Sequence, residues 1–368
     1  MIYLDYNATA PYSDSVKDYI SNTMINDWAN PSSEHDAGYA LTIKIKEARS
    51  NIAEYLDIST KNLFFTSGAT ESINNVLSSQ NLISNNIKRI ITSKMEHHAT
   101  LDTVKKREEE GFEVHYINND KHGALDLLEL EEFLQDGKPT LVSLLYVNNE
   151  TGVINDISEV SKLCRTNNAL LHVDAVQALG KIKFSLDDLD VDFASFAGHK
   201  IGAMKGVGLL YIANLKKFSP NQTGGGQEKR IRPGTYNLPA IESFALALKD
   251  IKTESYDKLI SLSSQTTEYI KNNTSIVINC EQSIRSPNTF NLYLRGTDSR
   301  TVMLNLSRSD IMLSTGSACS SGSYEPSHVI KALGYDREYA SSCLRLSFGT
   351  NSRIEDIKLA LDRINSFL

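Results

Sequence analysis

Short apolar runs alternate with amphipathic stretches through the first part of the chain. Each run is followed by a segment with the spacing of an amphipathic helix, and this alternation is the βαβ rhythm of a parallel sheet. The pattern predicts roughly seven strands in one large domain. The strand candidates are 62–66, 89–92, 141–146, 169–173, 191–197 and 208–212.

The pattern changes after about residue 250. A long helix is predicted near 254–272, followed by strands near 275–280 and 288–294 and then by the Ser/Gly-rich segment 314–323. This order is typical of a smaller α+β domain. We therefore expect an α/β chain with a large domain over 14–250 and a small domain built from 1–13 and 251–368.

The size and composition agree with two folded domains around one cleft. The 368 residues exceed the size at which one hydrophobic core stops growing, and 40% of them are hydrophobic. The formal charge of −7 argues against direct nucleic-acid binding and against broad binding to anionic membranes. The N-terminal residues 1–6 contain no basic segment followed by a long apolar run, so we expect neither a signal peptide nor a membrane anchor, and a cytoplasmic protein.

Lys200 and Asp174 are the most informative pair of residues. Asp174 follows the apolar segment 169–173, and Lys200 follows the next predicted strand in the segment 195–200. An amine is needed to form a Schiff base with pyridoxal phosphate, and a buried carboxylate is needed to keep the pyridine nitrogen protonated. A helix N-cap explains a lone aspartate about as well, but it does not explain the lysine after the next strand.

The small residues of 66–72 leave a strand and open a helix. Several backbone N–H groups and the helix dipole would then converge on one point, which is an arrangement that binds phosphate. The plain alternative is an ordinary strand-to-helix turn with a Ser or Thr cap, and this segment alone favours that alternative.

His97 also lies just past a predicted strand. Its flat imidazole would stack on a cofactor ring and transfer protons near neutral pH. The neighbouring His98 competes for this role, and a structural histidine with ordinary hydrogen bonds is an equally good interpretation of the pattern.

The four cysteines are far apart in sequence and lack the close pairs of zinc ribbons or redox dithiols, so no metal site is expected. Cys319 lies in the Ser/Gly-rich segment and is predicted to be on an exposed, mobile loop of about 314–325, where a thiolate would be accessible as a nucleophile. An incidental surface thiol is the alternative. Cys164 and Cys280 lie among apolar residues and are predicted to be structural.

Arg345 interrupts the strand-like run 344–348. A guanidinium among apolar neighbours needs an anionic partner, and a substrate carboxylate would match its planar fork. A structural ion pair is the alternative interpretation.

Together these residues resemble the cysteine desulfurases, within the class V aminotransferase group of fold type I pyridoxal-phosphate enzymes. The resemblance spans nearly the whole chain and is to the subgroup with a long Ser/Gly-rich cysteine loop. It implies a mostly parallel seven-stranded sheet flanked by helices, with a smaller α+β domain that carries the cysteine loop. The matching segments are 3–9, 30–33, 67–72, 96–97, 147–152, 195–200, 232–235, 314–323 and 344–347.

The resemblance also implies a role for each site residue. Asp174 would contact the ring nitrogen, His97 would stack on the ring, and Lys200 would bind the cofactor covalently. Asn149 and Gln177 would lie near the ring oxygen, and Asn149 and Arg345 would bind the substrate carboxylate. The phosphate would be surrounded by Ala69, Thr70, His199 and Thr235, the last reaching across from the partner subunit of a homodimer.

The implied reaction converts L-cysteine to L-alanine. Lys200 or His97 moves protons at Cα, and Cys319 takes the sulfur as a persulfide and passes it to an acceptor protein. Two alternatives stay open: a selenocysteine lyase or another class V lyase, which would not need Cys319, and a desulfurase-like scaffold subunit with weak activity. The acceptor pathway is also open among iron–sulfur clusters, transfer RNA, a cofactor and DNA modification, since the sequence ends at Leu368 without the longer tail through which some relatives dock an iron–sulfur scaffold.

The sequence departs from the family pattern at two places beside Lys200. Ala197 stands where the family usually offers a serine hydroxyl to the phosphate, and the segment 202–204 replaces one that usually contains Gly-Pro. A lost hydrogen bond to a charged group costs about 1.5–3 kcal/mol, so we expect weaker cofactor affinity rather than inactivation.

Overall fold

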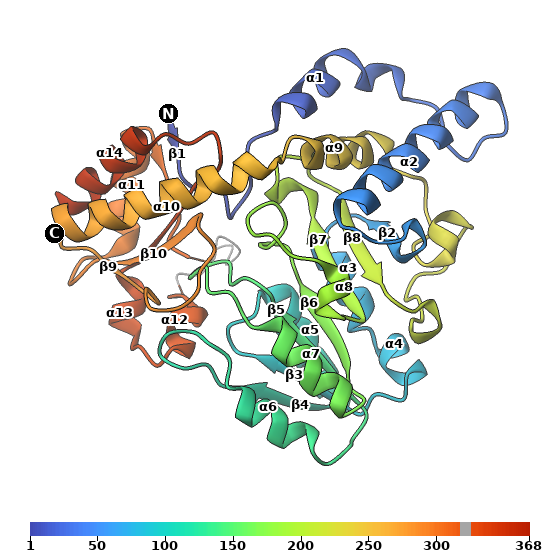
Figure 1. Ribbon diagram of the computed structural model, residues 1–368, viewed down its shortest axis with the longest axis horizontal. Helices are drawn as coiled ribbons and strands as arrows, with labels where there is room; N and C mark the ends of the chain where they lie inside the picture. Colours follow the sequence, from blue (N-terminus) through green and yellow to red (C-terminus); the bar gives the residue numbers. More distant parts are fainter. Residues whose placement is uncertain (317–324) are drawn as a thin grey trace.

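The computed structural model describes residues 1–316 and 325–368. Its largest sheet has seven strands, which confirms the fold predicted from the sequence (Figure 1). Six of these strands run parallel, and β8 runs antiparallel to both of its neighbours. In spatial order the strands are β2 (Leu63–Thr66), β8 (Gly208–Ile212), β7 (Phe193–Ala197), β6 (Leu170–Asp174), β5 (Thr140–Leu145), β3 (Arg89–Ser93) and β4 (Glu113–Ile117).

The six strands that the apolar pattern predicted are buried along their whole length because helices cover both faces of the sheet. Every residue of β2, β3, β5, β6, β7 and β8 is buried. The edge strand β4 differs, since four of its five residues are only partly buried. It contains Glu113 and His115, and for that reason the apolar pattern did not predict it.

Two layers of helices cover the large sheet. The helices α2 (Asp36–Tyr55), α6 (Leu127–Leu134), α7 (Ile157–Thr166) and α9 (Leu238–Lys249) pack on one face, where α2 and α9 lie side by side (Figure 1). The helices α3 (Ala69–Val76), α4 (Ser79–Ser84) and α5 (His98–Glu109) pack on the other face. The remaining helices of this part are α1 (Asp14–Asn22) and α8 (Leu186–Leu189), with 3₁₀ turns at Met24–Asn26, Thr60–Asn62, Gly198–Lys200, Leu215–Lys217 and Gln227–Arg230.

The C-terminal part has its own sheet and its own core. After α10 (Thr253–Asn273), an antiparallel sheet forms in the order β12 (Cys343–Ser347), β10 (Thr289–Tyr293) and β9 (Val277–Ile278). Its apolar core includes side chains of α10, α11 (Ser299–Arg308) and α14 (Ile354–Asn365). The short elements are β11 (Ile311–Met312), α12 (His328–Ala332) and α13 (Arg337–Ser341).

The N-terminal segment connects the two sheet systems. β1 (Ile2–Tyr3) pairs in parallel with β11, and the Tyr6 amide donates to Ser347 O at 3.2 Å. The chain then crosses to the large sheet, where the Ala10 amide donates to His199 O at 2.9 Å. Residues 4–13 therefore lie against the turn that carries Lys200.

Within the described ranges, no helix combines the length and the apolar character needed to cross a membrane.

Candidate active site

The candidate residues gather because the parallel strands end at one edge of the sheet. In such sheets ligands bind outside the carboxyl ends of the strands. The structure follows this rule: Ala69 and Thr70 come after β2, His97 after β3, Asn149 after β5, Asp174 ends β6, and Lys200 comes after β7.

Asp174 is a buried carboxyl group whose negative charge is stabilised by few neighbouring groups. Its Oδ1 accepts a hydrogen bond from the Val176 amide at 3.0 Å. Burial raises the pKa of Asp174 to about 6, and the nearby Lys200 ammonium and the Val176 hydrogen bond only partly oppose this shift. A protonated ring nitrogen placed at this carboxylate would supply the missing positive charge.

Lys200 ends the 3₁₀ turn that follows β7. Its Nζ donates to two backbone carbonyls of the crossing N-terminal segment, Asn7 O at 2.7 Å and Ala8 O at 2.9 Å. The neighbouring His199 makes a 3.3 Å hydrogen bond between Nδ1 and Thr9 Oγ1. Burial, with the nearby lysine charges, lowers the pKa of His199 to about 4, so its imidazole is neutral at pH 7.

The structure distinguishes His97 from His98. His97 caps the N-terminus of α5 by accepting from the Ala99 amide at 3.0 Å. Burial and the nearby Lys200 charge lower the pKa of His97 to about 4. His98 turns instead toward Asp102, and its ring packs on His328 with centroids 4.8 Å apart. His97 therefore lies close to Lys200, whereas the ring of His98 packs on the small-sheet side against His328.

The N-terminus of α3 offers its first amides to an anion. Glu71 already accepts the Ser67 amide at 2.7 Å and pairs with Arg232, whose Nε lies 2.9 Å from Glu71 Oε1. The amides of Ala69 and Thr70 belong to the first turn and have no acceptor within the helix. Thr70 and His97 line one cavity of about 690 Å³, so a phosphate group at this helix end would lie beside the imidazole.

Arg345 is buried in the middle of β12, and it already has an anionic partner. Its Nη2 donates to Asp5 Oδ1 at 2.8 Å, and its Nη1 donates to Asn149 O at 3.2 Å. The Nε atom of Arg345 is buried and has no hydrogen-bond partner within the described ranges. The structural ion pair with Asp5 is thus present, and a separate hydrogen bond joins Arg345 to the backbone carbonyl of Asn149.

The structure also gives the surroundings of Gln177, Ala197 and Thr235. Gln177 lies in the turns that follow Asp174, and its Nε2 donates to Asn7 O at 3.0 Å. Ala197 is the buried last residue of β7 and pairs with Gly208. Thr235 is exposed on the surface of the chain.

Cys319 lies outside the described residues. The other three thiols are buried, and burial raises the pKa of Cys164, Cys280 and Cys343 to about 12 in each case. A thiol with such a pKa is almost wholly protonated at pH 7 and is therefore a poor nucleophile. Cys164 and Cys280 are structural, as predicted.

Sequence reasoning missed Asp5, Asn7 and Lys181. All three lie within hydrogen-bonding distance of predicted site residues: Asp5 of Arg345, and Asn7 and Lys181 of Gln177. The segment 3–9 was noticed as a matching motif, but nothing in its local pattern shows that it passes between the two sheets. Lys181 follows the turn after Asp174 and looks like a surface lysine in sequence.

Comparison with known proteins agrees with this geometry. The family model described as aminotransferase class-V matches residues 2–359. The cysteine desulfurase IscS of Vibrio vulnificus strain YJ016 is 36% identical over 99% of this chain and 91% of its own length. The chain belongs to the cysteine desulfurases of the class V aminotransferase family. IscS of Salmonella schwarzengrund is 37% identical over the same shares of the two chains. A solved structure described as a NifS-like protein superposes with a TM-score of 0.89 at 34% identity, covering 100% of both chains.

Membership in this family makes the chain a pyridoxal-phosphate-dependent enzyme, and the residues present fit that cofactor. Asp174 is a buried carboxyl group short of positive charge, α3 opens with amides that have no acceptor within the helix, and His97 is a neutral imidazole close to Lys200. Bound pyridoxal phosphate supplies an electron-withdrawing ring that stabilises negative charge at the substrate Cα.

Proposed function

We propose that this enzyme converts L-cysteine to L-alanine and transfers the sulfur to Cys319. The observation that carries the proposal is the placement of Asp174, Lys200 and His97 at the carboxyl ends of β6, β7 and β3, which lie at the same edge of the large sheet. Arg345 of the small sheet contacts Asn149, which follows β5. In the net step the carbon–sulfur bond of cysteine breaks, a sulfur–sulfur bond forms on Cys319, and the thiol proton balances the hydrogen gained by alanine.

Lys200 and His97 are the groups that move protons in this proposal. Lys200 Nζ would hold the cofactor, and the same amine would take and return the proton at the substrate Cα. Burial and the nearby Lys200 charge lower the pKa of His97 to about 4, so its imidazole is neutral at pH 7. Its Nδ1 accepts from the Ala99 amide, so the neutral ring carries its proton on Nε2.

Arg345 and Asn149 bind the substrate carboxylate in this proposal. The carboxylate joins or replaces Asp5 at the guanidinium, because a planar fork pairs with one carboxylate at a time on each edge. The buried Nε of Arg345 supports the proposal, since it has no hydrogen-bond partner among residues 1–316 and 325–368 and is a donor for a second acceptor.

We propose a homodimer in which Thr235 reaches the phosphate of the partner's site. Large exposed apolar side chains support this assembly: Ile25, Trp28 and Tyr39 are 79%, 82% and 62% exposed. The ion pair between Lys44 Nζ and Asp27 Oδ1, at 2.6 Å, holds the turn with Trp28 against α2. Exposed apolar surface of this kind is typical of a protein interface.

The remaining parts of the proposal concern the domain division, the cellular location and the acceptor of the sulfur. We propose the domain division at residues 13/14 and 250/251, a cytoplasmic location, and an acceptor protein that receives sulfur from Cys319. The relatives reported above are cysteine desulfurases, which favours cysteine as substrate over the selenocysteine-lyase alternative.

Alanine formation from L-cysteine by the Lys200→Ala enzyme tests the proposal. We expect no cofactor absorbance change on adding cysteine and at least a hundredfold lower rate, because both the covalent anchor and the Cα base are lost. Lys205→Ala is the matched control, since Lys205 is exposed in the same connection between β7 and β8. Undiminished alanine formation by Lys200→Ala would refute the assignment.

A further inference from the structure

Residues 228–230 adopt a backbone conformation that residues with a Cβ atom normally avoid. The φ angles of Glu228, Lys229 and Arg230 are 48°, 54° and 68°, in the left-handed region. This region is usually occupied by glycine or by single residues. Within residues 1–316 and 325–368, this is the only run of three consecutive non-glycine residues with positive φ angles. Such a turn persists only when the surrounding structure holds it.

The carboxylate of Glu228 makes contacts that can hold the turn. Its Oε2 accepts from Arg49 Nη1 at 3.0 Å, and its Oε1 accepts from Arg49 Nη2. Glu228 is 5% exposed, and the Arg49 guanidinium lies over the Phe65 ring, 4.5 Å from the ring centroid. An arginine that pairs with both oxygens of a carboxylate fixes the geometry of the two side chains as well as binding them strongly.

The ion pair is attached to the free edge of the large sheet. β2 is the outermost strand on its side, so one edge of its backbone has no neighbouring strand. Glu228 Oε2 accepts from the Phe65 amide at 2.7 Å, and Arg49 Nη1 donates to Leu63 O at 2.6 Å. Glu228 and Arg49 therefore bind the backbone of β2 where a further strand would otherwise pair.

The left-handed turn holds the residues on either side of Thr235. The Gly234 amide donates to Gln227 Oε1 at 3.2 Å, and the Glu228 amide donates to the Tyr236 hydroxyl at 3.1 Å. Thr235 itself is exposed, so its position depends on these two neighbours. The contacts of the Glu228 carboxylate are thus transmitted through the backbone of the turn to Thr235.

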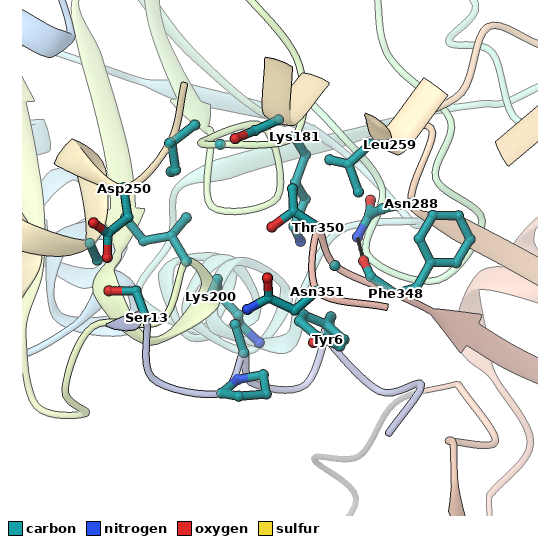
Figure 2. Close-up of a pocket in the computed structure, with 18 of the residues that line it drawn as sticks. Tyr6, Ser13, Lys181, Lys200, Asp250, Leu259, Asn288, Phe348, Thr350 and Asn351 are labelled. Carbon is teal, nitrogen blue, oxygen red and sulfur yellow. Dashed lines mark hydrogen bonds between the residues drawn. The ribbon is translucent and has the colours of Figure 1, made fainter. Parts of the chain in front are cut away.

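This segment lies apart from the cavity around Lys200. Figure 2 shows that cavity, whose wall includes Lys200, Lys181 and Asn288, and none of the described residues 224–236 lines it. Residues 228, 232, 234 and 236 instead line a small cavity of about 30 Å³ together with residues 65–67. The segment is therefore beside the end of β2 and the turn proposed to bind phosphate.

We propose that Glu228 is a positioning residue for Thr235: its carboxylate, bound by Arg49 and by the edge of β2, keeps residues 228–230 in the left-handed turn and so presents the Thr235 hydroxyl to the phosphate of pyridoxal phosphate. The inference rests on the proposed role of Thr235 at the phosphate of the partner's site. It adds that this donor is placed by a buried ion pair of its own subunit.

The test compares two aldehydes that differ only in the phosphate group. The full-length enzyme is freed of cofactor and titrated with pyridoxal phosphate or with pyridoxal, and the change in absorbance gives a dissociation constant for each. Loss of a phosphate contact weakens the binding of pyridoxal phosphate alone. A general loss of structure weakens the binding of both compounds.

Glu228→Gln keeps the size of the side chain and an acceptor for the Phe65 amide, but it removes the charge that binds Arg49. We expect the dissociation constant for pyridoxal phosphate to rise about tenfold in this variant and in Thr235→Ala, because both lose one hydrogen bond to a charged group. The double variant should bind no more weakly than Thr235→Ala, since both changes remove the same contact. The dissociation constant for pyridoxal should equal that of the wild type in all three variants.

Asp136→Asn is the matched control. Asp136 also accepts two hydrogen bonds from one arginine, Arg89, at 2.9 and 2.7 Å, but this pair lies at the start of β3, away from the carboxyl ends of the strands. Both dissociation constants of this variant should equal those of the wild type. Arg49→Lys, which keeps the charge and loses the two-fold pairing, replaces Glu228→Gln if that variant does not fold, and it should give the same phosphate-specific change.

Three results contradict the account, each in a different way. If Thr235→Ala weakens the binding of pyridoxal phosphate but the Glu228 and Arg49 variants do not, the positioning role is wrong and the proposed function stands. If Glu228→Gln weakens the binding of both aldehydes equally, the ion pair is purely structural. If Thr235→Ala binds pyridoxal phosphate with the wild-type affinity, Thr235 does not contact the phosphate and that part of the proposed function is wrong.

Discussion

Arg345 Nη2 donates to Asp5 Oδ1 across 2.8 Å, so the guanidinium proposed to bind the substrate is already paired with a carboxylate of the same chain. The pair joins β12 to the segment that follows β1. Because Arg345 also donates to Asn149 O, the fork is oriented toward the loop that follows β5. An arginine held in this way is preorganised for a carboxylate.

Arg345→Lys should raise the KM for L-cysteine by about ten- to a hundredfold, because a point charge replaces a fork and one charge-assisted hydrogen bond of about 1.5–3 kcal/mol is lost. Steady-state alanine formation at varied cysteine concentration measures this change. Cofactor absorbance should be unchanged, since Arg345 does not face the cofactor groups in the proposal. Arg353→Lys is the control, because that arginine is exposed and pairs with Asp356 at the surface. An unchanged KM in Arg345→Lys would show that the ion pair with Asp5 is purely structural.

Ala197→Ser should strengthen cofactor binding. Ala197 ends β7 beside the turn that carries Lys200, where the family usually has a hydroxyl. One added hydrogen bond to the phosphate is worth about 1.5–3 kcal/mol, so the dissociation constant for pyridoxal phosphate should fall at least about tenfold. Equilibrium dialysis or fluorescence titration measures it. Ala213→Ser is the control, because Ala213 follows β8 at the end of the sheet away from Lys200, and its affinity for pyridoxal phosphate should equal that of the wild type. If Ala197→Ser also bound pyridoxal phosphate with the wild-type affinity, the phosphate would not lie beside residue 197.

His172 makes the cofactor-free protein sensitive to acid. It lies buried in β6 between Ser143 Oγ at 2.8 Å and Ser195 Oγ at 2.9 Å, and burial lowers its pKa to about 3. In the unfolded chain His172 has its ordinary pKa of 6.5, whereas in the folded chain its pKa is about 3. Between these two pH values only the unfolded chain binds the proton, so the free energy of unfolding decreases as the pH falls through this range. The free energy of unfolding should fall by up to ~1.4 kcal/mol per pH unit from this residue.

His172→Gln keeps a hydrogen-bonding side chain between the two serines and removes the titration. Urea unfolding of the cofactor-free variant between about pH 4 and 7 should therefore show a smaller loss of stability with acid than the wild type. His122→Gln, a variant at a partly exposed histidine, should behave like the wild type. If the free energy of unfolding fell equally with acid in His172→Gln and in the wild type, the titration of His172 would not be the cause of the acid sensitivity.

The sheet was predictable from sequence wherever burial on both faces required continuous apolar runs. The prediction for β8, 208–212, matches the structure residue for residue, because its residues are all buried. The edge strand β4 was missed for the opposite reason, since Glu113 is partly exposed there and pairs with Arg89 and Lys138. The antiparallel direction of β8 also has no local signature in the sequence.

Site residues that directly follow a strand could be predicted from the sequence. Site residues that are brought together by contacts between distant parts of the chain could not. Asp174, His97 and Lys200 were found because a parallel sheet brings strand ends together. The contacts of Asn7 with Lys181 and Lys200 join residues separated by 174 and 193 positions. Such contacts depend on the path of the N-terminal segment between the two sheets. The periodicity of apolar residues in the sequence does not predict this path.

The central claim is that Cys319 takes the sulfur of L-cysteine, and mass spectrometry of the holoenzyme after incubation with L-cysteine tests it most directly. The buried thiol of Cys343, which accepts from Asn279 Nδ2 at 3.3 Å, provides the matched control. We predict that one added sulfur atom is found on the Cys319 peptide of the wild type and of Cys343→Ala, and that Cys319→Ala carries no persulfide and forms alanine at least a hundredfold more slowly. Alanine formation at the wild-type rate by Cys319→Ala, or an added sulfur on another cysteine, would contradict the account.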